Sequence, residues 1–228
     1  MTRLDRVLKS CNRSNHPPAR FNAENFMSKN VLCGFWCLLL ALLAGANFPL
    51  NAEPPQSAST SWQLDPVHSF GLFRVQHMNA GMFWGRFNDV TGTIAHHEDG
   101  SVPPKLVVRC AVESIDTGSE KLDRTMLGPK WFNGKEHEAM TFVSTSGEKI
   151  DATHWKLQGD LTIAGVSREV EVMTELTGIG GGPQGRKIGF ECTVEINRNA
   201  FGIRILRGAI GDKVRLVVGL EGDEITAG

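Results

Sequence analysis

The sequence predicts an all-β domain, an antiparallel sandwich or barrel of about eight short strands. Apolar and polar residues alternate with a period of two from Trp62 onward, which is typical of a sheet with one buried and one solvated face. Turn residues separate the alternating segments at short intervals, for example at Glu98-Asp99-Gly100 and Ala164-Gly165. No motif recurs with a period of about 20–50 residues, which disfavours a solenoid or a propeller.

Eight segments carry the alternation, and one segment interrupts it. In the clearest segment, over 213–221, every second residue is a large aliphatic one. The interruption begins at Thr117-Gly118-Ser119-Glu120, which fits a helix capping box, and ends at Gly128-Pro129, which stops a helix. We therefore expect one short helix at about 117–127. The strands are expected at residues 69–77, 86–95, 105–115, 140–146, 155–163, 168–177, 187–197 and 213–221.

The N-terminal extension has the features of a targeting segment. Residues 1–46 contain six Lys or Arg against two Asp or Glu, an uncharged apolar run over 31–43, and small residues at Ala44-Gly45-Ala46. This order is typical of a cleaved secretory signal peptide, whereas a membrane anchor needs roughly 18–20 apolar residues. We therefore expect a signal peptide region over 1–46, translation from Met27, and a periplasmic or secreted protein. An uncleaved N-terminal anchor is the alternative.

The rest of the chain divides into a linker and one domain. Residues 47–61 are rich in Pro and Ser and are expected to form a polar linker, followed by the folded domain over 62–224. The formal net charge of −1 gives no electrostatic reason to bind nucleic acid. After removal of the leader only Cys110 and Cys192 remain. Their spacing matches no zinc pattern, and they either pair in an oxidising compartment or stay as buried thiols.

Seven motifs, in order, resemble those of a known family. They are Asp65-Pro66-Val67-His68-Ser69, Phe73-x-Val75-x-His77, Gly85-x-Phe87-x-x-Val90-x-Gly92-x-Ile94, Ser114-Ile115-Asp116-Thr117, Thr141-Phe142-x-Ser144, Gly159-Asp160-Leu161-Thr162-Ile163-x-Gly165-Val166 and Ile196-Asn197-Arg198-x-x-Phe201-Gly202. From Trp62 to Glu221 the chain thus resembles the YceI-like polyisoprenoid-binding family. The resemblance implies an exported, lipocalin-like barrel of eight antiparallel strands whose long apolar tunnel holds an isoprenoid chain. Two places depart from the pattern: Gly71 replaces a bulky aliphatic residue, and 136–138 lacks the usual Tyr-Pro.

The alternation itself predicts which side chains face the interior. An eight-stranded barrel is just wide enough for its side chains or for one slender ligand. Each buried CH₂ of a ligand contributes about 0.8 kcal/mol, so an apolar interior binds a hydrocarbon tail without hydrogen bonds. A solid core is the alternative, and the residues alone favour it; the resemblance favours the ligand. The expected inward positions are Phe73, Val75, Phe87, Val90, Ile94, Val108, Phe142, Ile163, Phe190, Val194 and Val218.

Two polar residues accompany this apolar set. His77 shares a face with Phe73 and Val75, so we expect an interior histidine that is either structural or in contact with a ligand's polar head. Arg198 either anchors the turn over 197–202 or binds a head group, and the structural role is favoured. The candidate ligand-binding residues are therefore Phe73, Val75, His77, Phe87, Val90, Phe142, Phe190, Val194 and Arg198.

Other chemistries have weaker signals. Asp65, His68, Ser69 and His77 contain the residue types of a nucleophilic triad, but alternation places His68 and Ser69 on opposite faces and no G-x-S-x-G motif surrounds the serine. His96-His97 before a turn is expected to be a solvated hairpin tip and not a metal site. The glycine run from Gly178 is expected to be a hairpin loop, because no Gly-Lys-Ser/Thr or helix follows it.

We therefore expect an exported, non-enzymatic protein that holds an amphipathic isoprenoid or other long-chain lipid, polyprenyl or quinone-like, for sequestration or transport. No cofactor, metal or nucleic acid is expected, and a transient membrane contact fits such a role. The alternatives are a stress-response or interaction module with a packed core and, with less support, an esterase acting on a bound lipid.

Overall fold

The computed structural model describes residues 58–183 and 185–226, so the expected signal peptide and the linker up to residue 57 lie outside the described residues. Its elements are, in chain order, β1 (Ser59–Leu64), β2 (Phe70–His77), β3 (Gly81–Phe87), β4 (Val90–His97), β5 (Lys105–Ala111), the 3₁₀ turn η1 (Val112–Ser114), β6 (Ile115–Asp116), α1 (Glu120–Met126), β7 (Ala139–Lys149), β8 (His154–Ile163), β9 (Val166–Gly182), β10 (Gly185–Asn197), the 3₁₀ turn η2 (Arg198–Phe201) and β11 (Ile210–Glu224).

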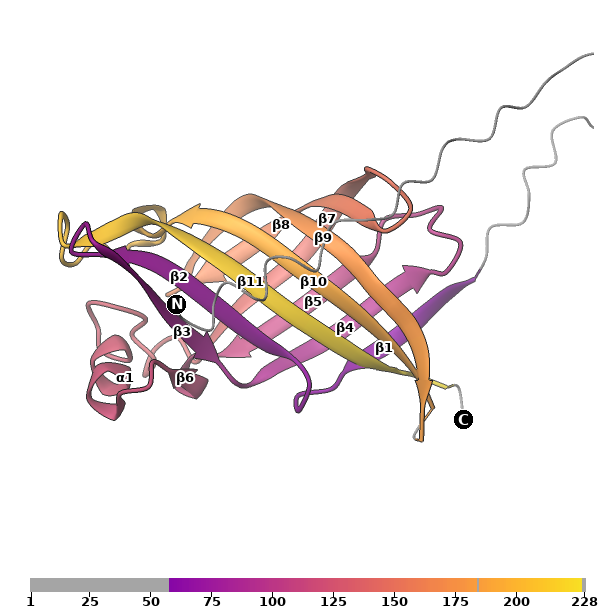
Figure 1. The fold of residues 1–228 in the computed structure, drawn as a ribbon, viewed down its shortest axis with the longest axis horizontal. Coiled ribbons are helices and arrows are strands. Elements are labelled where there is room, and N and C mark those ends of the chain that lie inside the picture. The colour runs from indigo at the N-terminus through magenta and orange to yellow at the C-terminus, as the bar shows by residue number, and fades with distance from the viewer. Residues whose placement is uncertain (1–57, 184, 227–228) are drawn as a thin grey trace, which may run out of the picture. The chain divides into compact units, whose positions relative to one another are not determined.

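Eight of these strands close into an antiparallel barrel (Figure 1). The hydrogen-bonded order is β1-β4-β5-β7-β8-β9-β10-β11, and β11 pairs back onto β1. Trp62 of β1 completes the ring, because it pairs with Ile94 of β4 on one side and with Glu224 of β11 on the other. The predicted fold, an eight-stranded antiparallel barrel with one short helix, is confirmed.

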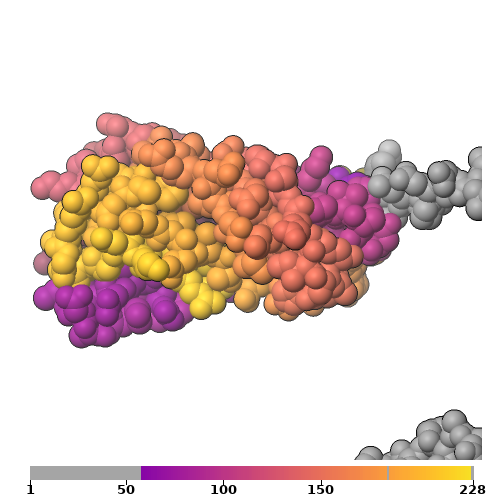
Figure 2. All heavy atoms as spheres, turned by 90° about the horizontal axis from the view of Figure 1, so that it is seen from above, coloured from indigo at the N-terminus to yellow at the C-terminus, as the bar shows by residue number. Residues whose placement is uncertain are grey.

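Strands β2, β3 and β6 extend one end of the barrel beyond this ring. β1 pairs with the last residues of β11, whereas β2 pairs with its earlier part, from Ile210 to Gly219. β3 pairs with β2 and carries the short β6 on its other edge. In the space-filling view, the early strands in indigo lie against the residues after 200 in yellow at this end (Figure 2).

Helix α1 starts later than the capping box predicts. Its N-cap is Ser119, which makes no side-chain cap hydrogen bond, and the helix covers Glu120–Met126. Thr117 lies outside the helix, where both its backbone N–H and its hydroxyl donate to the Asp123 carboxylate, at 2.8 and 2.6 Å. Asp123 thus fixes the entry to the helix from within it, and Glu120 does not reach back as a capping box requires.

Several strands also differ from the expectation: the segment predicted as one strand at 86–95 is divided between β3 and β4, and the predicted strands do not include β1. β1 begins at Ser59, three residues before Trp62, and pairs with β4 from its first residue. The glycine run is strand and not loop, because Gly178–Gly182 belong to β9 and pair with β10 as far as Gly182 opposite Gly185. Backbone hydrogen bonds hold these glycines in the ladder although they have no side chains to pack.

The interior of the barrel has two halves. One half is a packed cluster around Trp62, Trp155 and Phe190. The other contains two smaller clusters, one around Ile163 and Phe201 and one around Phe73 and Phe87. The site described below lies between the two smaller clusters.

Candidate functional site

An apolar cavity of about 150 Å³ occupies the half of the barrel next to α1 and η2. Strands β2, β3, β5, β7, β8, β10 and β11 all contribute to its wall, with Phe73, Phe87, Phe142 and Leu216 among the largest side chains. The segment that follows α1 adds Trp131 and Phe132, and η2 and the residues after it add Phe201 and Ile203. Because the lining is almost entirely hydrocarbon, the part of a ligand that fits here is apolar.

Two of the wall aromatics rest on glycines of the neighbouring strand. Phe73 of β2 pairs with Gly85 of β3, and its ring occupies the space that a Cβ on Gly85 would take. Phe142 of β7 lies over Gly159 of β8 in the same way, with its Cε2 2.5 Å from an ideal Cβ position. Because these glycines have no side chains, both rings can lie close to the neighbouring strand and the cavity beside them stays open.

Five of the nine residues predicted to contact a ligand line the cavity: Phe73, Val75, Phe87, Phe142 and Arg198. Val90 and Phe190 belong instead to the packed cluster, and Val194 is half-buried between that cluster and the one around Ile163. The wall also includes Ile196, Phe201, Ile203, Val214 and Leu216. Val214 and Leu216 follow the alternation on β11, whereas Phe201 ends the 3₁₀ turn η2 and Ile203 comes after it, so neither has a periodic signal.

His77 does not face the interior as predicted. It is the last residue of β2, where it pairs with Ile210, and its side chain is exposed. The alternation that buries Phe73 and Val75 ends there, because the chain leaves β2 for the turn to β3 directly after His77. His77 thus lies on the rim of the barrel beside a cavity-lining residue, Ile210.

The packed half contains no extension of the cavity. Trp62, Trp155 and Leu157 are 0% exposed, and Phe190 is 2% exposed. Among the described residues, no buried member of this cluster lines the cavity. The tunnel implied by the family resemblance is therefore a pocket in this structure, because two indoles and a phenyl ring fill the space beyond Phe142.

His96 contradicts the prediction of a solvated hairpin tip. It is 1% exposed and packs edge-on against Trp155 and Phe190, with ring centroids 5.6 Å away in both cases. Burial lowers the pKa of its imidazole. Neither ring nitrogen has a hydrogen-bond partner within the described residues, and the indole N–H groups of Trp62 and Trp155 share this property.

Arg198 is buried in the cavity wall, but its guanidinium is turned toward the backbone. Its Nε donates to Gly211 O at 2.9 Å, and Nη1 donates to Ile203 O and Ile205 O at 2.9 and 2.8 Å. Nη2 donates to Ile210 O at 3.0 Å and to Asp212 Oδ1 at 3.4 Å. All five donors of a guanidinium are thereby used to hold the loop over 203–212. Desolvation lowers the pKa of Arg198.

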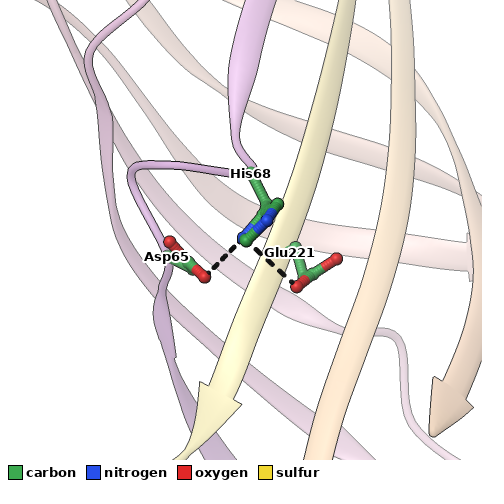
Figure 3. A group of neighbouring side chains, drawn as sticks. All are labelled: Asp65, His68 and Glu221. Atoms are coloured by element: carbon green, nitrogen blue, oxygen red, sulfur yellow. Dashed lines mark hydrogen bonds and ion pairs between the residues drawn. The ribbon is translucent and has the colours of Figure 1, made fainter. Parts of the chain in front are cut away.

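The Asp65-to-Ser69 motif forms the corner between β1 and β2 (Figure 3). His68 Nδ1 lies 2.7 Å from Asp65 Oδ2 and 3.7 Å from Glu221 Oε1. The hydrogen bond with His68 lowers the pKa of Asp65 to about 2, and Asp65 in turn raises the pKa of His68. Lys187 Nζ lies 3.3 Å from Asp65, 3.0 Å from Glu221 and 2.7 Å from Asp223, and these carboxylates raise its pKa.

This corner has a structural geometry. Ser69 is 1% exposed, and its hydroxyl donates to Glu221 O at 3.2 Å and accepts from Glu221 N at 3.0 Å. His68 points instead to Asp65, so the serine and histidine do not form a nucleophile–base pair. Asp65, His68 and Glu221 offer three ligand atoms within 4.8 Å of one another, but both carboxylates already form ion pairs with the Lys187 ammonium.

Cys110 and Cys192 are both free thiols. Burial raises the pKa of Cys110 to about 12 and that of Cys192 to about 11. Cys110 is half-buried in the cavity wall, whereas Cys192 belongs to the packed cluster and lies 3.7 Å from the Thr174 hydroxyl. Neither thiol has the lowered pKa of a reactive cysteine.

None of the helices within residues 58–183 and 185–226 has the length and apolar character needed to span a bilayer.

Comparisons with known proteins agree with this architecture. Protein YceI of Escherichia coli O157:H7 is 31% identical over 181 residues, which cover 79% of this chain and 94% of that protein. The crystal structure of the Campylobacter jejuni YCEI protein matches with 28% identity and a TM-score of 0.57, over 67% of this chain and 90% of that one. A polyisoprenoid binding domain from Saccharophagus degradans has the same fold at 14% identity, with a TM-score of 0.58, over 73% of this chain and 99% of that one.

The sequence model of the YceI-like domain matches residues 62–222, which is essentially the whole barrel and includes every strand that lines the cavity. The chain therefore belongs to the YceI-like domain family.

Proposed function

We propose that this protein is exported and holds the hydrocarbon tail of an amphipathic isoprenoid, polyprenyl or quinone-like, in the cavity between β2, β7 and β11. The observation that carries the proposal is the composition of the wall. Apart from the Thr141 hydroxyl, the Cys110 thiol and the Arg198 guanidinium that is bound to backbone, its side chains are apolar, including the thioethers of Met126 and Met140 and the indole of Trp131. Such a wall binds a tail by burial alone, at about 0.8 kcal/mol per CH₂.

Three further observations support the proposal. A solved domain of the same fold is described as polyisoprenoid binding. The leader over 1–46 has the order of basic, apolar and small residues that export requires. Finally, Ser69 and His68 make separate structural bonds, so binding without turnover fits the site better than ester hydrolysis.

The cavity residues have distinct roles in this proposal. Phe73, Val75, Phe87 and Phe142 contact the tail. Val90, Phe190 and Val194 contact only a ligand long enough to displace the packed cluster. Arg198 is a positioning residue that holds the loop over 203–212 against the cavity, and the exposed His77 contacts a head group that stays at the rim.

The packed half of the barrel favours a second candidate, an interaction or stress-response module without a ligand. Trp62 and Trp155 are completely buried there, and that half is as solid as an ordinary core. The two candidates differ in what the half next to α1 does, because only a carrier needs an open and apolar space at that position.

Native mass spectrometry with organic extraction distinguishes them. The protein is purified from an exported preparation and then loaded with farnesol, geranylgeraniol and ubiquinone-type quinones. A bound species, or stoichiometric loading that is lost on filling the cavity by Leu216→Trp, supports carriage. Failure to co-purify and to load with every one of these lipids refutes carriage and supports the packed-core module.

A further inference from the structure

Four large apolar side chains are exposed together at the cavity end of the barrel. Met78, Met82 and Trp84 lie on the β2–β3 hairpin and are 62%, 51% and 49% exposed, and Leu206 on the loop before β11 is 54% exposed. The hairpin and the loop are joined, because Met78 N donates to Ala209 O at 2.6 Å and the Asn79 amide donates to Gly208 O at 3.2 Å. The four side chains therefore lie on two joined segments at this end of the barrel.

Two of these side chains stand on strained backbone. Met78 has φ 53° and Leu206 has φ 54°, both in the left-handed region. Bulky residues rarely adopt this conformation, and glycine or asparagine there would relieve the strain and also be better solvated. The chain thus places large apolar groups at the tips of the rim against both the conformational and the solvation preference.

Cations flank the apolar tips. On the outer wall, Arg74 of β2 stands directly opposite Arg215 of β11, and the Arg74 guanidinium lies 5.7 Å from the Trp84 ring centroid. Like charges directly opposite each other destabilise an antiparallel pair. With Lys213 they line a shallow groove of about 300 Å³ on the outside of the barrel. Glu195 and Asp212 also border this groove, and Glu195 forms an ion pair with Lys213 at 2.8 Å.

The charge of the described chain is divided accordingly. Segments 70–84 and 195–215 contain six Lys or Arg and two Asp or Glu, a net charge of +4. The remaining described residues contain twelve basic and twenty acidic side chains, a net charge of −8. The two segments that carry the exposed apolar tips are therefore positive, whereas the remaining described residues together are negative.

We propose that this rim docks onto the surface of an anionic lipid bilayer. The mouth surface consists of Arg74, Met78, Met82, Trp84, Arg204, Leu206, Arg207, Lys213 and Arg215. Its cations match anionic head groups, and its tryptophan and apolar tips suit the interfacial layer of a bilayer. The net charge of −8 on the remaining described residues repels the other faces of the domain from an anionic surface. The same loop supplies Ile203 and Ile210 to the cavity wall, so docking brings the cavity to the bilayer. The purpose of docking rests on the proposed function, but docking itself is measured without a ligand.

Vesicle co-sedimentation tests the surface. Because the described residues after 57 form a closed barrel by themselves, a chain from Asn47 onward is used. We expect it to sediment with phosphatidylcholine vesicles containing phosphatidylglycerol, and not with pure phosphatidylcholine. R74Q/R215Q should weaken this binding on the order of twentyfold, since each cation near an anionic surface contributes roughly fivefold. The matched control K105Q/R109Q removes two exposed cations from β5 and should change binding less than threefold.

A spectroscopic readout reports the apolar contact. Trp62 and Trp155 are fully buried and Trp131 is half-buried in the cavity wall, so a blue shift of tryptophan emission on addition of anionic vesicles is assigned to Trp84 if W84F abolishes it. Inorganic phosphate at matched ionic strength should not displace the protein. Equal binding to both vesicle types, equal losses in the two double variants, or retention on an acidic polypeptide but not on vesicles would overturn the proposal. Farnesol loading of R74Q/R215Q in solution separates the two proposals, because a loss of loading there concerns the cavity and not the docking.

Discussion

The ring of Phe73 occupies the place where a side chain of its cross-strand partner Gly85 would lie. This pair keeps the phenyl ring on the wall and out of the centre of the cavity. It is therefore a position where one methyl group on the neighbouring strand controls the space available to a ligand.

Gly85→Ala should reduce ligand capacity by pushing the Phe73 ring into the cavity. We expect farnesol loading to fall at least tenfold and the free energy of unfolding to decrease by about 1–3 kcal/mol, as for other overpacked cores. Gly81→Ala, on the same strand with open space around the new methyl group, is the matched control and should change neither. Unchanged loading in Gly85→Ala would show that the ligand lies elsewhere.

Arg198→Met should destabilise the fold by about 3 kcal/mol or more, because it leaves four backbone carbonyls of the 203–212 loop without their charged donor. Denaturation in urea measures the loss. Arg204→Met removes an exposed arginine with one long hydrogen bond, 3.4 Å to Asn199 O, and should cost less than 0.5 kcal/mol by the usual range for surface substitutions, about ±0.5 kcal/mol. Similar losses in the two variants would contradict the anchoring role.

His96 should make the protein less stable in acid. Its pKa is lowered in the folded state, so at a pH below the unfolded value of 6.5 the unfolded chain binds a proton that the folded chain does not. The stability of the fold therefore decreases as the pH is lowered. The slope contributed by one proton is at most about 1.4 kcal/mol per pH unit. His68 and His154 have raised pKa values and act in the opposite direction, since their contribution is complete below 6.5 and is lost as pH rises.

The difference between the wild type and His96→Phe isolates this effect, because both share His68 and His154. Urea denaturation between pH 7.5 and pH 5 should show a steeper loss of stability in the wild type than in the variant. Parallel curves would mean that His96 is hydrated or protonated in the folded state.

Ser69→Ala should affect stability and not catalysis. The hydroxyl bonds both the N–H and the C=O of Glu221, so its removal should cost about 1–2 kcal/mol. Ser101→Ala is the control for thermal unfolding, because Ser101 is exposed and donates to Asp99 Oδ1 through its backbone N–H, which the substitution keeps. Any hydrolysis of p-nitrophenyl acyl esters that disappears specifically in Ser69→Ala would revive the esterase alternative.

Cys110 gives a chemical probe of the cavity. With a pKa of about 12 it should react with maleimides far more slowly than a free thiol at pH 7.5, and a bound lipid should slow it further. Cys192, with a pKa of about 11 and no place in the cavity wall, should show no protection by the lipid. Equal protection of both thiols would indicate global stabilisation and not occupancy of the cavity.

The sequence predicted the direction of side chains correctly within the strands, where the alternation continues on either side of the residue. It placed Phe73, Val75, Phe87 and Phe142 on the interior face correctly. The prediction failed near strand ends in both directions: His77 was predicted to be interior and is exposed, whereas His96 was predicted to be solvated and is buried. Periodicity states which face a residue takes, but the end of a strand relative to its neighbours depends on register between distant segments.

The sequence by itself determined the class of fold, the family and the apolar character of the interior, because period-two alternation and short motifs are local properties of the chain. Only the tertiary structure decided that half of this interior is solid and half is hollow. Whether space remains depends on the summed volumes of side chains from all the surrounding strands, including Trp62 and Trp155 in one half and Gly85 and Gly159 in the other. The same holds for Arg198, whose role follows from five acceptors that only the folded loop brings together.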